Sequence, residues 1–388
     1  RSTLFPYTTL FRSGRRFDVS SSALLTRLQS ISKVIASKNT LPILDSFLFQ
    51  LEGNKLTITA SDVETRLVTT VDVMNANGSG LFAVSAKILL EPLKELPEQP
   101  LVFEINDDNL STIVRYENGK YEFIGQRGDT YPQQKPLSEN AMGFTMESQV
   151  LLNGIGRAFF ATADDELRPV MNGIYFDIQT DNLTFVASDG HKLVRLRNLA
   201  VRSEGRASFI LPKKPANLLK ALLPKNTDPV KIAFDENNAY VKTVNFEMVC
   251  RLIEGRYPNY NSVIPQDNPN KVTVDRVSLL MALKRVSVSS NPASGLVKLQ
   301  LLKDAMMISA QDIDFSTSAE ERVMCQYEGM DLSIGFKGTF LIEILSNINS
   351  GEIVLELADP SRAGVVVPVE NEPEEELLML LMPMVLND

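Results

Sequence analysis

Residues 17–35 read FDVSSSALLTRLQSISKVI, an extended triplet followed by apolar residues at helical spacing. The residues expected on the apolar face of that helix are Leu24, Leu28, Ile31 and Ile35. Two later stretches open alike, FTMESQVLLNGIGRAFFATA at 144–163 and VTVDRVSLLMALKRVSVSS at 272–290, where Leu279, Leu280, Leu283 and Val286 share a face. The openings start 127 and 128 residues apart, so the sequence predicts three repeats of one domain-sized segment.

A pair of short strands follows each opening. Apolar residues alternate with polar ones on both sides of a turn in residues 48–62, 175–189 and 299–312, which is typical of a β-hairpin. Each hairpin ends in an aspartate at the same place, namely Asp62, Asp189 and Asp312. A residue type that recurs at the same place in all three repeats suggests a structural role.

A second helix and further strands complete each repeat. The expected helices contain KILLEPLKEL, KKPANLLKALL and TFLIEILSNI, and the strands that follow contain LVFEIN, VKIAF and EIVLEL. The fold class is therefore α+β, with two helices packed on antiparallel sheets in every repeat. Polar, proline-bearing stretches near residues 140 and 268 mark the boundaries, which gives domains at 15–140, 141–268 and 269–388.

The first residues differ in character from the rest. Residues 1–13 read RSTLFPYTTLFRS, which has no continuity with the repeat that follows and resembles translated adapter or vector sequence. We therefore expect residues 1–14 to be a non-native extension, excluded from the fold. A genuine N-terminal extension is the alternative.

Composition disfavours an enzyme. The chain has one histidine, His191, and two cysteines, so triads based on histidine and zinc sites are not expected. It also lacks a glycine-rich phosphate-binding loop, and we expect no cofactor and no metal. The two cysteines suggest a reducing, cytoplasmic location, and no apolar run is long enough for a membrane span.

Charge is unevenly distributed along the chain. The net charge of −9 disfavours an ordinary DNA-binding protein. The six stretches expected to be helical nevertheless contain 14 lysines and arginines against 6 aspartates and glutamates. A basic surface on an acidic body would attract a polyanion if the helices shared one side, whereas ordinary solvated helix faces are the alternative.

Four motifs in this order resemble the beta subunit of bacterial DNA polymerase III, the sliding clamp family. They are TLPIL at 40–44, ASDGHKL at 187–193, GRYPNY at 255–260 and MPM at 382–384. The resemblance spans about residues 15–386 and implies the DNA clamp fold, closed into a ring as a head-to-tail homodimer. It implies that Tyr121 and Phe123, on an edge strand of the first domain, meet the third domain near Val288.

The resemblance also implies partners. Double-stranded DNA is encircled without sequence specificity, and the ring holds a replicative DNA polymerase, the clamp loader, other polymerases and repair proteins. The residues matched to DNA-facing positions are Lys38, Lys87, Arg168, Lys213 and Lys214. This chain departs from the family pattern at Pro169 and Val170, where some relatives carry tyrosine, so these two are not included.

A partner-peptide groove on the second and third domains is implied by the same resemblance. The matching residues are Met171, Ser188, Gly190, His191, Lys192, Leu193, Pro258, Val263, Phe340, Leu380, Leu381, Met382, Pro383 and Met384. Methionines adapt to several partners. Ser262 replaces the usual basic residue, which predicts a different peptide preference.

Other interpretations remain at this point. Asp164, Asp165 and His191 could serve a hydrolase, although an acidic run such as 164–166 is more often a solvated loop. The acidic run at 370–376 is expected to be an exposed loop, and residues 377–386 could form a core strand without a binding role. A repeat scaffold that binds no nucleic acid is a further alternative.

Overall fold

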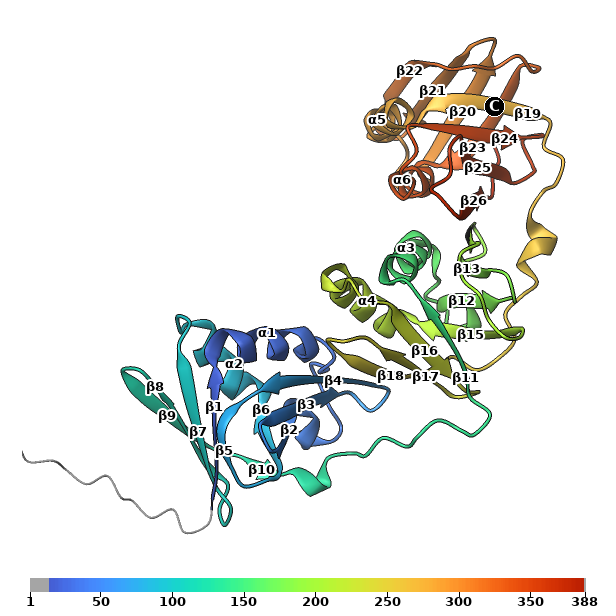
Figure 1. The fold of residues 1–388 in the computed structure, drawn as a ribbon. Coiled ribbons are helices and arrows are strands. Elements are labelled where there is room, and N and C mark those ends of the chain that lie inside the picture. The colour runs from blue at the N-terminus through green and yellow to red at the C-terminus, as the bar shows by residue number, and fades with distance from the viewer. Residues whose placement is uncertain (1–13, 387–388) are drawn as a thin grey trace, which may run out of the picture. The chain divides into compact units, whose positions relative to one another are not determined.

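The computed structural model describes residues 14–386 (Figure 1). The predicted extension, residues 1–14, lies outside them except for Gly14, which begins strand β1. Within the described residues the chain forms two compact units. One contains the residues up to Gly143 together with Asp228–Arg251, and the other contains Phe144–Thr227 and the residues from Leu252 onward.

Six α-helices occur in residues 14–386. They are α1 (Ser21–Ser32), α2 (Ala86–Lys94), α3 (Ser148–Ala158), α4 (Lys213–Leu222), α5 (Arg276–Ser287) and α6 (Gly338–Ser346). All six lie where the sequence predicts helices, with shorter ends. The expected apolar faces are buried, except that Ile35 lies beyond the end of α1 and is only partly buried.

Side-chain caps explain two of the helix starts. Ser20 accepts the Ala23 N–H at the start of α1, and Asp275 accepts the Ser278 N–H at the start of α5. Such a cap satisfies a backbone donor that the first helical turn leaves without a partner. In the first and third repeats the capping residue directly follows the extended triplet, so the strand leads straight into the helix.

The first unit contains two antiparallel sheets. The five-stranded sheet has the order β5 (Met74–Asn77), β1 (Gly14–Ser20), β7 (Pro100–Asn106), β8 (Ser111–Tyr116), β9 (Gly119–Ile124). The nine-stranded sheet has the order β10 (Gln126–Arg127), β6 (Gly80–Ser85), β2 (Ser46–Glu52), β3 (Lys55–Ser61), β4 (Thr65–Asp72), β18 (Glu247–Arg251), β17 (Asn238–Lys242), β16 (Val230–Phe234), β11 (Met142–Met146). Helices α1 and α2 pack on each other and on these sheets.

The second unit contains two more antiparallel sheets. The eight-stranded sheet has the order β15 (Ala207–Pro212), β12 (Gly173–Ile178), β13 (Leu183–Ser188), β14 (Lys192–Asn198), β26 (Glu375–Leu381), β25 (Gly364–Pro368), β24 (Glu352–Leu357), β19 (Asn270–Asp275). The four-stranded sheet has the order β22 (Thr317–Met324), β21 (Ala305–Asp312), β20 (Leu296–Leu302), β23 (Leu332–Lys337). Helices α3 and α4 pack together, as do α5 and α6.

Two strand pairs join segments that the sequence assigns to different repeats. Strand β4 pairs with β18, which places strands of the first and second repeats in one sheet. Strand β14 pairs with β26, which does the same for the second and third repeats. Backbone hydrogen bonds thus run across the expected domain junctions, and they set the residues of β14 beside those of β26.

The sequence analysis predicted that the acidic run at 370–376 is an exposed loop. This prediction is wrong for the end of the run. Glu375 begins strand β26 and is buried, and Asn153 of α3 donates to its carboxylate at 3.3 Å. Burial is the main cause that raises the pKa of Glu375. The last residues of the run therefore belong to the sheet. Their side chains alternate between its two faces, with Glu375 buried and Glu376 exposed.

Candidate functional site

The loop between β13 and β14 is closed by Asp189. Its carboxylate accepts the backbone N–H groups of His191 and Lys192, each at 2.9 Å. Asp62 does the same for Glu64 and Thr65 in the first repeat, at 3.0 and 2.7 Å. The predicted structural role of the aspartate is confirmed, because one of its carboxylate oxygens accepts two backbone N–H groups of the turn.

An apolar cluster lies next to this loop. Leu193 and Leu380 are cross-strand partners on β14 and β26, and both are buried in it. The other buried members are Val186, Ile210, Tyr257, Tyr260, Ile264 and Ala363. Two of the predicted groove residues are therefore brought together by the pairing of β14 with β26.

Aromatic side chains hold the segment after residue 255 against this sheet. The ring of Tyr257 stacks on that of Tyr175, with centroids 4.6 Å apart. The Tyr260 hydroxyl donates to Asp177 at 2.6 Å. Burial raises the pKa of both Tyr257 and Tyr260 above the usual range, so their hydroxyls stay neutral. The motif GRYPNY is thus a packing element beside the cluster.

Exposed apolar side chains adjoin the cluster. Val263 lies in the 3₁₀ turn Tyr260–Val263, just before the buried Ile264, and is 57% exposed. Met382 follows Leu381 and is 43% exposed. Its N–H donates to the carbonyl of His191 at 2.8 Å. Apolar surface at the margin of a buried cluster suits an apolar ligand.

Residues 382–384 are hydrogen-bonded to the rest of the unit. After the Met382 bond, the Met384 N–H donates to the carbonyl of Gly335 on β23 at 2.7 Å. Residues 377–381 form the buried part of the run, and residues 382–386 are partly or fully exposed. The run therefore consists of a core strand followed by an accessible segment, and the groove role of residues 382–384 stays a prediction.

Phe340 of α6 packs with the β13–β14 loop. Its ring centroid lies 6.0 Å from that of His191 and 3.9 Å from the Lys192 ammonium. Lys192 Nζ also lies 3.1 Å from Asp189 and 3.4 Å from Glu343 of α6. These contacts fix the loop against the third repeat.

Several predicted groove residues do not present side chains beside Leu193. Lys192 and Leu381 pair across the strands one position away, so they point to the opposite face, and both are buried. Ser188 donates its hydroxyl to the carbonyl of Lys192 at 2.9 Å, a contact within the turn. Met171 lies in the loop that follows Arg168 and is buried. Gly190 and Pro258 are exposed, and Pro383 is half-buried.

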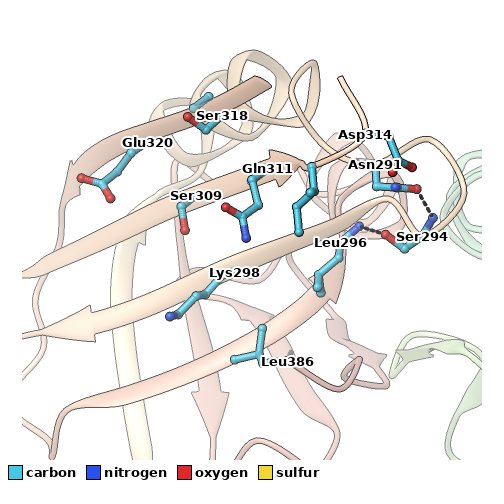
Figure 2. Close-up of a pocket in the computed structure, with 13 residues that line it drawn as sticks. Asn291, Ser294, Leu296, Lys298, Ser309, Gln311, Asp314, Ser318, Glu320 and Leu386 are labelled. Carbon is cyan, nitrogen blue, oxygen red and sulfur yellow. Dashed lines mark hydrogen bonds between the residues drawn. The ribbon is translucent and has the colours of Figure 1, made fainter. Parts of the chain in front are cut away.

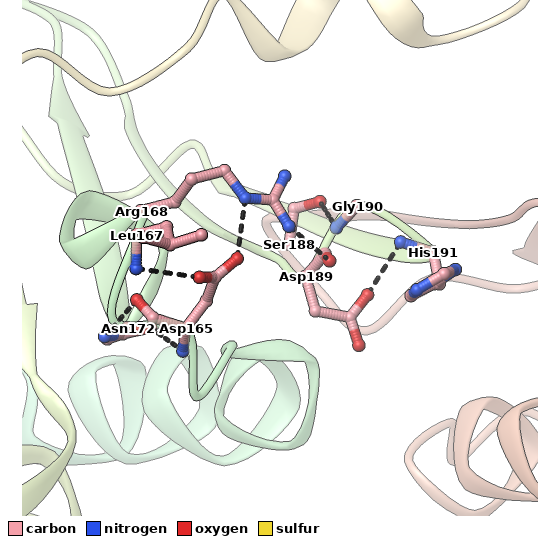
Figure 3. A network of polar contacts seen from close by, with 8 residues as sticks. All are labelled: Asp165, Leu167, Arg168, Asn172, Ser188, Asp189, Gly190 and His191. Carbon is pink, nitrogen blue, oxygen red and sulfur yellow. Dashed lines mark hydrogen bonds and ion pairs between the residues drawn. The ribbon is translucent and has the colours of Figure 1, made fainter.

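Residues 164–172 form a loop that contacts the β13–β14 turn (Figure 3). The guanidinium of Arg168 lies 2.8 Å from the Asp165 carboxylate, and its Nη2 reaches the carbonyl of Asp189 at 3.5 Å. Gly190 has φ of +88°, and a Cβ there would lie 3.3 Å from Arg168 Nη1. Hydrogen bonds to Arg168 and to backbone N–H groups lower the pKa of Asp165. A glycine therefore suits position 190 on two grounds.

The residues matched to DNA-facing positions divide between the two units. In the second unit, Lys213 begins α4 and lies 2.6 Å from Asp164, and Lys214 next to it is exposed. In the first unit, Lys38 follows α1 and Lys87 lies in the first turn of α2, and both are exposed. The acidic residues 164 and 165 thus form ion pairs with Lys213 and Arg168, which argues for a structural role of this acidic run.

The helices remain basic when their limits are taken from the structure. The six helices of residues 14–386 contain ten lysines and arginines and two acidic residues, Glu91 and Glu343. They therefore carry a net charge of +8, within a chain whose net charge is −9. The segregation predicted from the sequence persists when the true helix ends are used.

The residues expected at a subunit contact lie on or beside strands at sheet edges. Strand β9 is the outer strand of the five-stranded sheet, and the rings of Tyr121 and Phe123 stack on it with centroids 6.2 Å apart. Strand β22 is the outer strand of the four-stranded sheet. Val288, which caps α5 beside that sheet, is 85% exposed. An edge strand presents backbone donors and acceptors that another strand can pair with.

A hollow of about 810 Å³ lies on the face of the four-stranded sheet that carries Lys298, Ser309 and Gln311 (Figure 2). Leu386 reaches its rim. The residues that line it belong to the third repeat, and most are polar. This hollow is separate from the apolar cluster around Leu193. The candidate site is that cluster, because the β14–β26 pairing and the exposed apolar side chains lie there.

The sequence analysis missed some members of the site. Val170, Tyr175, Ile253 and Leu378 pack against the Leu193 cluster without appearing among the predicted residues. The alternation of strand residues could have pointed to Tyr175 and Leu378, which share a face with Arg195 on β14. Val170 comes from a loop, and no periodic pattern indicates its position.

Family comparisons agree from residue 15 to residue 384. Three models that describe the DNA polymerase III beta subunit match in order, the N-terminal domain at residues 15–135, the central domain at 145–259 and the C-terminal domain at 261–384. The chain is 28% identical over 364 residues to a beta sliding clamp of Pseudomonas aeruginosa, covering 94% of this chain and 98% of that protein. A beta sliding clamp of Haemophilus influenzae is 26% identical, with 95% and 99% covered.

Solved structures give the same result. A DnaN sliding clamp of Pseudomonas aeruginosa, bound to griselimycin, matches with a TM-score of 0.91 at 27% identity, covering 96% of this chain and all of that one. The DNA polymerase III beta subunit of Thermotoga maritima matches with a TM-score of 0.87 at 26% identity and the same coverage. Among the residues that the structure describes, no helix is long and apolar enough to cross a membrane.

Proposed function

Because the chain belongs to the DNA polymerase III beta subunit family, the bacterial sliding clamps, we propose that it encircles duplex DNA and holds a replicative polymerase on it. The observation that carries this is the ordered match of all three clamp domains over residues 15–384. Clamp loader, other polymerases and repair proteins are its further partners. The protein acts in the cytoplasm by tethering and performs no catalysis of its own.

Ring closure needs two complementary edges. Strand β9 with Tyr121 and Phe123, and strand β22 near Val288, supply an edge strand and an exposed apolar side chain on separate sheets. We propose that β9 of one subunit pairs with β22 of its partner, which gives a closed homodimer. The division into domains 15–140, 141–268 and 269–388 then gives six domains around the ring.

DNA contact rests on the basic helices. A net charge of +8 on the six helices, within an acidic protein, supports a surface that attracts phosphates while the rest repels them. Lys38, Lys87, Lys213, Lys214 and Arg168 are the proposed contacts. Because Asp164 and Asp165 already pair with Lys213 and Arg168, phosphate contacts there replace existing ion pairs and stay weak, which suits sliding.

Partner binding rests on the exposed apolar side chains of Val263 and Met382, which border the buried pair Leu193 and Leu380, and this region is the proposed groove. It takes a short peptide with apolar side chains from each partner. Two of the related clamps are bound to griselimycin in their solved structures. We propose that this compound occupies this groove here, which would make it a probe for the groove.

The ring proposal is tested by the oligomeric state. Wild-type protein should be a dimer in light scattering, and the double variant Tyr121→Asp, Phe123→Asp should be a monomer, because it would bury charge in an apolar contact. A matched variant, Glu122→Gln, changes a residue of β9 between these two and should remain dimeric. A monomeric wild type, or a dimeric double variant, would contradict the proposed interface.

A further inference from the structure

Arg195 on strand β14 has an unusual environment. Its Nε atom is buried, and no acceptor lies within hydrogen-bonding distance of it in residues 14–386. Arg197, two residues on, has a partner, since its Nη1 lies 3.1 Å from a carboxylate oxygen of Glu376. Burial is the main cause that lowers the pKa of Arg195, and the charge of Arg197 lowers it further. A half-buried guanidinium without an acceptor is unfavourable, so its place in the sheet needs a reason.

The position of Arg195 follows from the strand register. Leu193 pairs with Leu380, and Arg195 pairs with Leu378 two positions along the same strands. Alternate residues of a strand point to the same face, so Arg195 and Leu193 lie side by side, about 7 Å apart. Leu378 packs against the same cluster as Leu193. Arg195 therefore flanks the proposed groove.

The other ionisable groups near Arg195 are already engaged. Glu376 pairs with Arg197, and Asp177 accepts the hydroxyl of Tyr260. A guanidinium has five donors in a planar fork and binds a carboxylate through two parallel hydrogen bonds. An acidic side chain brought by a partner fits this position, because it supplies the acceptor that the chain itself does not.

We propose that Arg195 receives an aspartate or glutamate of the partner peptide, two residues from the apolar side chain that packs beside Leu193 and Leu380, where Val263 and Met382 are exposed. An extended peptide repeats its side-chain direction every second residue, which matches the spacing of Leu193 and Arg195. This inference rests on the proposed peptide groove and adds a charge requirement to it. It makes Arg195 a specificity residue rather than a structural one.

The test uses the full-length protein and four fluorescein-labelled nine-residue peptides with a central Leu-Phe pair. One peptide has a glutamate two residues before the leucine, and a second has it two residues after the leucine. The other two peptides are controls in which glutamine replaces that glutamate. One glutamate peptide should bind wild-type protein roughly fivefold to tenfold more tightly than its match, as expected for a charge-assisted hydrogen bond. Arg195→Gln should abolish this difference, and Arg195→Lys should restore part of it.

The control variant is Lys298→Gln, which removes the same charge from the four-stranded sheet of the same unit and should keep the difference (Figure 2). Equal binding of both glutamate peptides and their matches to the wild type would overturn the role of Arg195 while leaving the groove intact. A difference that survives in Arg195→Gln would also overturn it. If the dimeric wild type binds none of the four peptides, the proposed groove itself fails.

Discussion

The hairpin ends of the first and second repeats have the same turn but different surroundings. Asp62 and Asp189 each accept two backbone N–H groups. Four residues later the first repeat has Arg66, whose Nη1 donates to the carbonyl of Pro132 at 2.6 Å and whose guanidinium lies 5.8 Å from the ring centroid of Tyr131.

The second repeat has Leu193 at that place, in an apolar cluster with exposed Val263 and Met382 beside it. A Tyr-Pro pair follows the strands of each of these two repeats, at Tyr131-Pro132 and Tyr257-Pro258, and each tyrosine is buried. The chain covers both positions, the first with Tyr131 and Pro132 and the second with Tyr257 and Tyr260, and the exposed side chains of Val263 and Met382 lie beside the second. The fold and the proposed binding site can therefore be considered separately. The turn is common to both repeats, whereas the residue four positions after the aspartate differs between them.

The largest effect should come from charge at Leu193. Leu193→Asp should weaken griselimycin binding more than roughly 100-fold, because a carboxylate would be buried among apolar side chains. Arg66→Leu gives the first repeat the residue of the second and should create no new binding, since Tyr131 and Pro132 cover the position. Calorimetric titration measures both. A second binding event in Arg66→Leu, or unchanged affinity in Leu193→Asp, would break the comparison.

The two aspartates should separate folding from binding. Asp62→Asn and Asp189→Asn each weaken a turn and should lower stability by about 1 kcal/mol. Only Asp189→Asn should also weaken griselimycin binding, roughly fivefold, because the same turn positions His191 and the carbonyl that holds Met382. Urea unfolding and titration check the two parts. Equal loss of binding in both variants would mean that the effect is general unfolding.

Glu375 sharpens the comparison within the second unit. Since burial raises its pKa, the ionised carboxylate is disfavoured in the fold, and stability falls as pH rises through the folded pKa. Arg157 opposes this shift and Glu372 adds to it. Glu375→Gln should therefore raise the melting temperature by about 2–4 °C at pH 8, with the gain shrinking towards pH 4.

Glu376→Gln is the matched control for that change. Glu376 is exposed and pairs with Arg197, so its loss should leave the melting temperature nearly unchanged at both pH values. Differential scanning calorimetry at the two pH values compares the variants. A gain from Glu375→Gln that is larger at pH 4 than at pH 8 would contradict the burial argument.

The smallest effect concerns the second helices of the same two repeats. Lys87 near the start of α2 is exposed, whereas Lys213 at the start of α4 is paired with Asp164. Asp164→Asn should release Lys213 and strengthen DNA binding about twofold at low salt, with the gain lost at high salt. Fluorescence anisotropy with duplex DNA measures this. Weaker DNA binding in the variant would show that Asp164 positions Lys213 rather than competing with phosphate.

Much of the fold could be predicted because it repeats. Three openings, three hairpins and six helices each reinforce the others, so single ambiguous stretches such as KKPANLLKALL were assigned correctly. Glu375 was not, because an acidic run gives no sign of where a strand begins. Glu375 is buried because of the direction in which its side chain points, and that direction depends on the pairing of β26 with β14.

The site was less predictable than the fold. The motif around residues 187–193 and the terminal MPM pointed to segments that the structure brings together, since the Met382 N–H donates to the carbonyl of His191. The ion pairs of Asp164 and Asp165 depend on loop geometry that no periodic pattern encodes. Arg195 reads as an ordinary polar position of an alternating strand. Its lack of an acceptor is visible only when the neighbouring strands are in place.

Retention on blocked DNA tests most directly whether this protein encircles duplex DNA. Labelled protein is allowed to thread onto a linear duplex at low salt, both ends are then blocked with biotin and streptavidin, and the salt is raised to remove ordinary phosphate contacts. The account predicts that dimeric protein stays on the blocked duplex and is released when a restriction enzyme cuts it. Loss of the protein from the blocked duplex, or its persistence after the cut, would contradict a ring that holds DNA by encircling it.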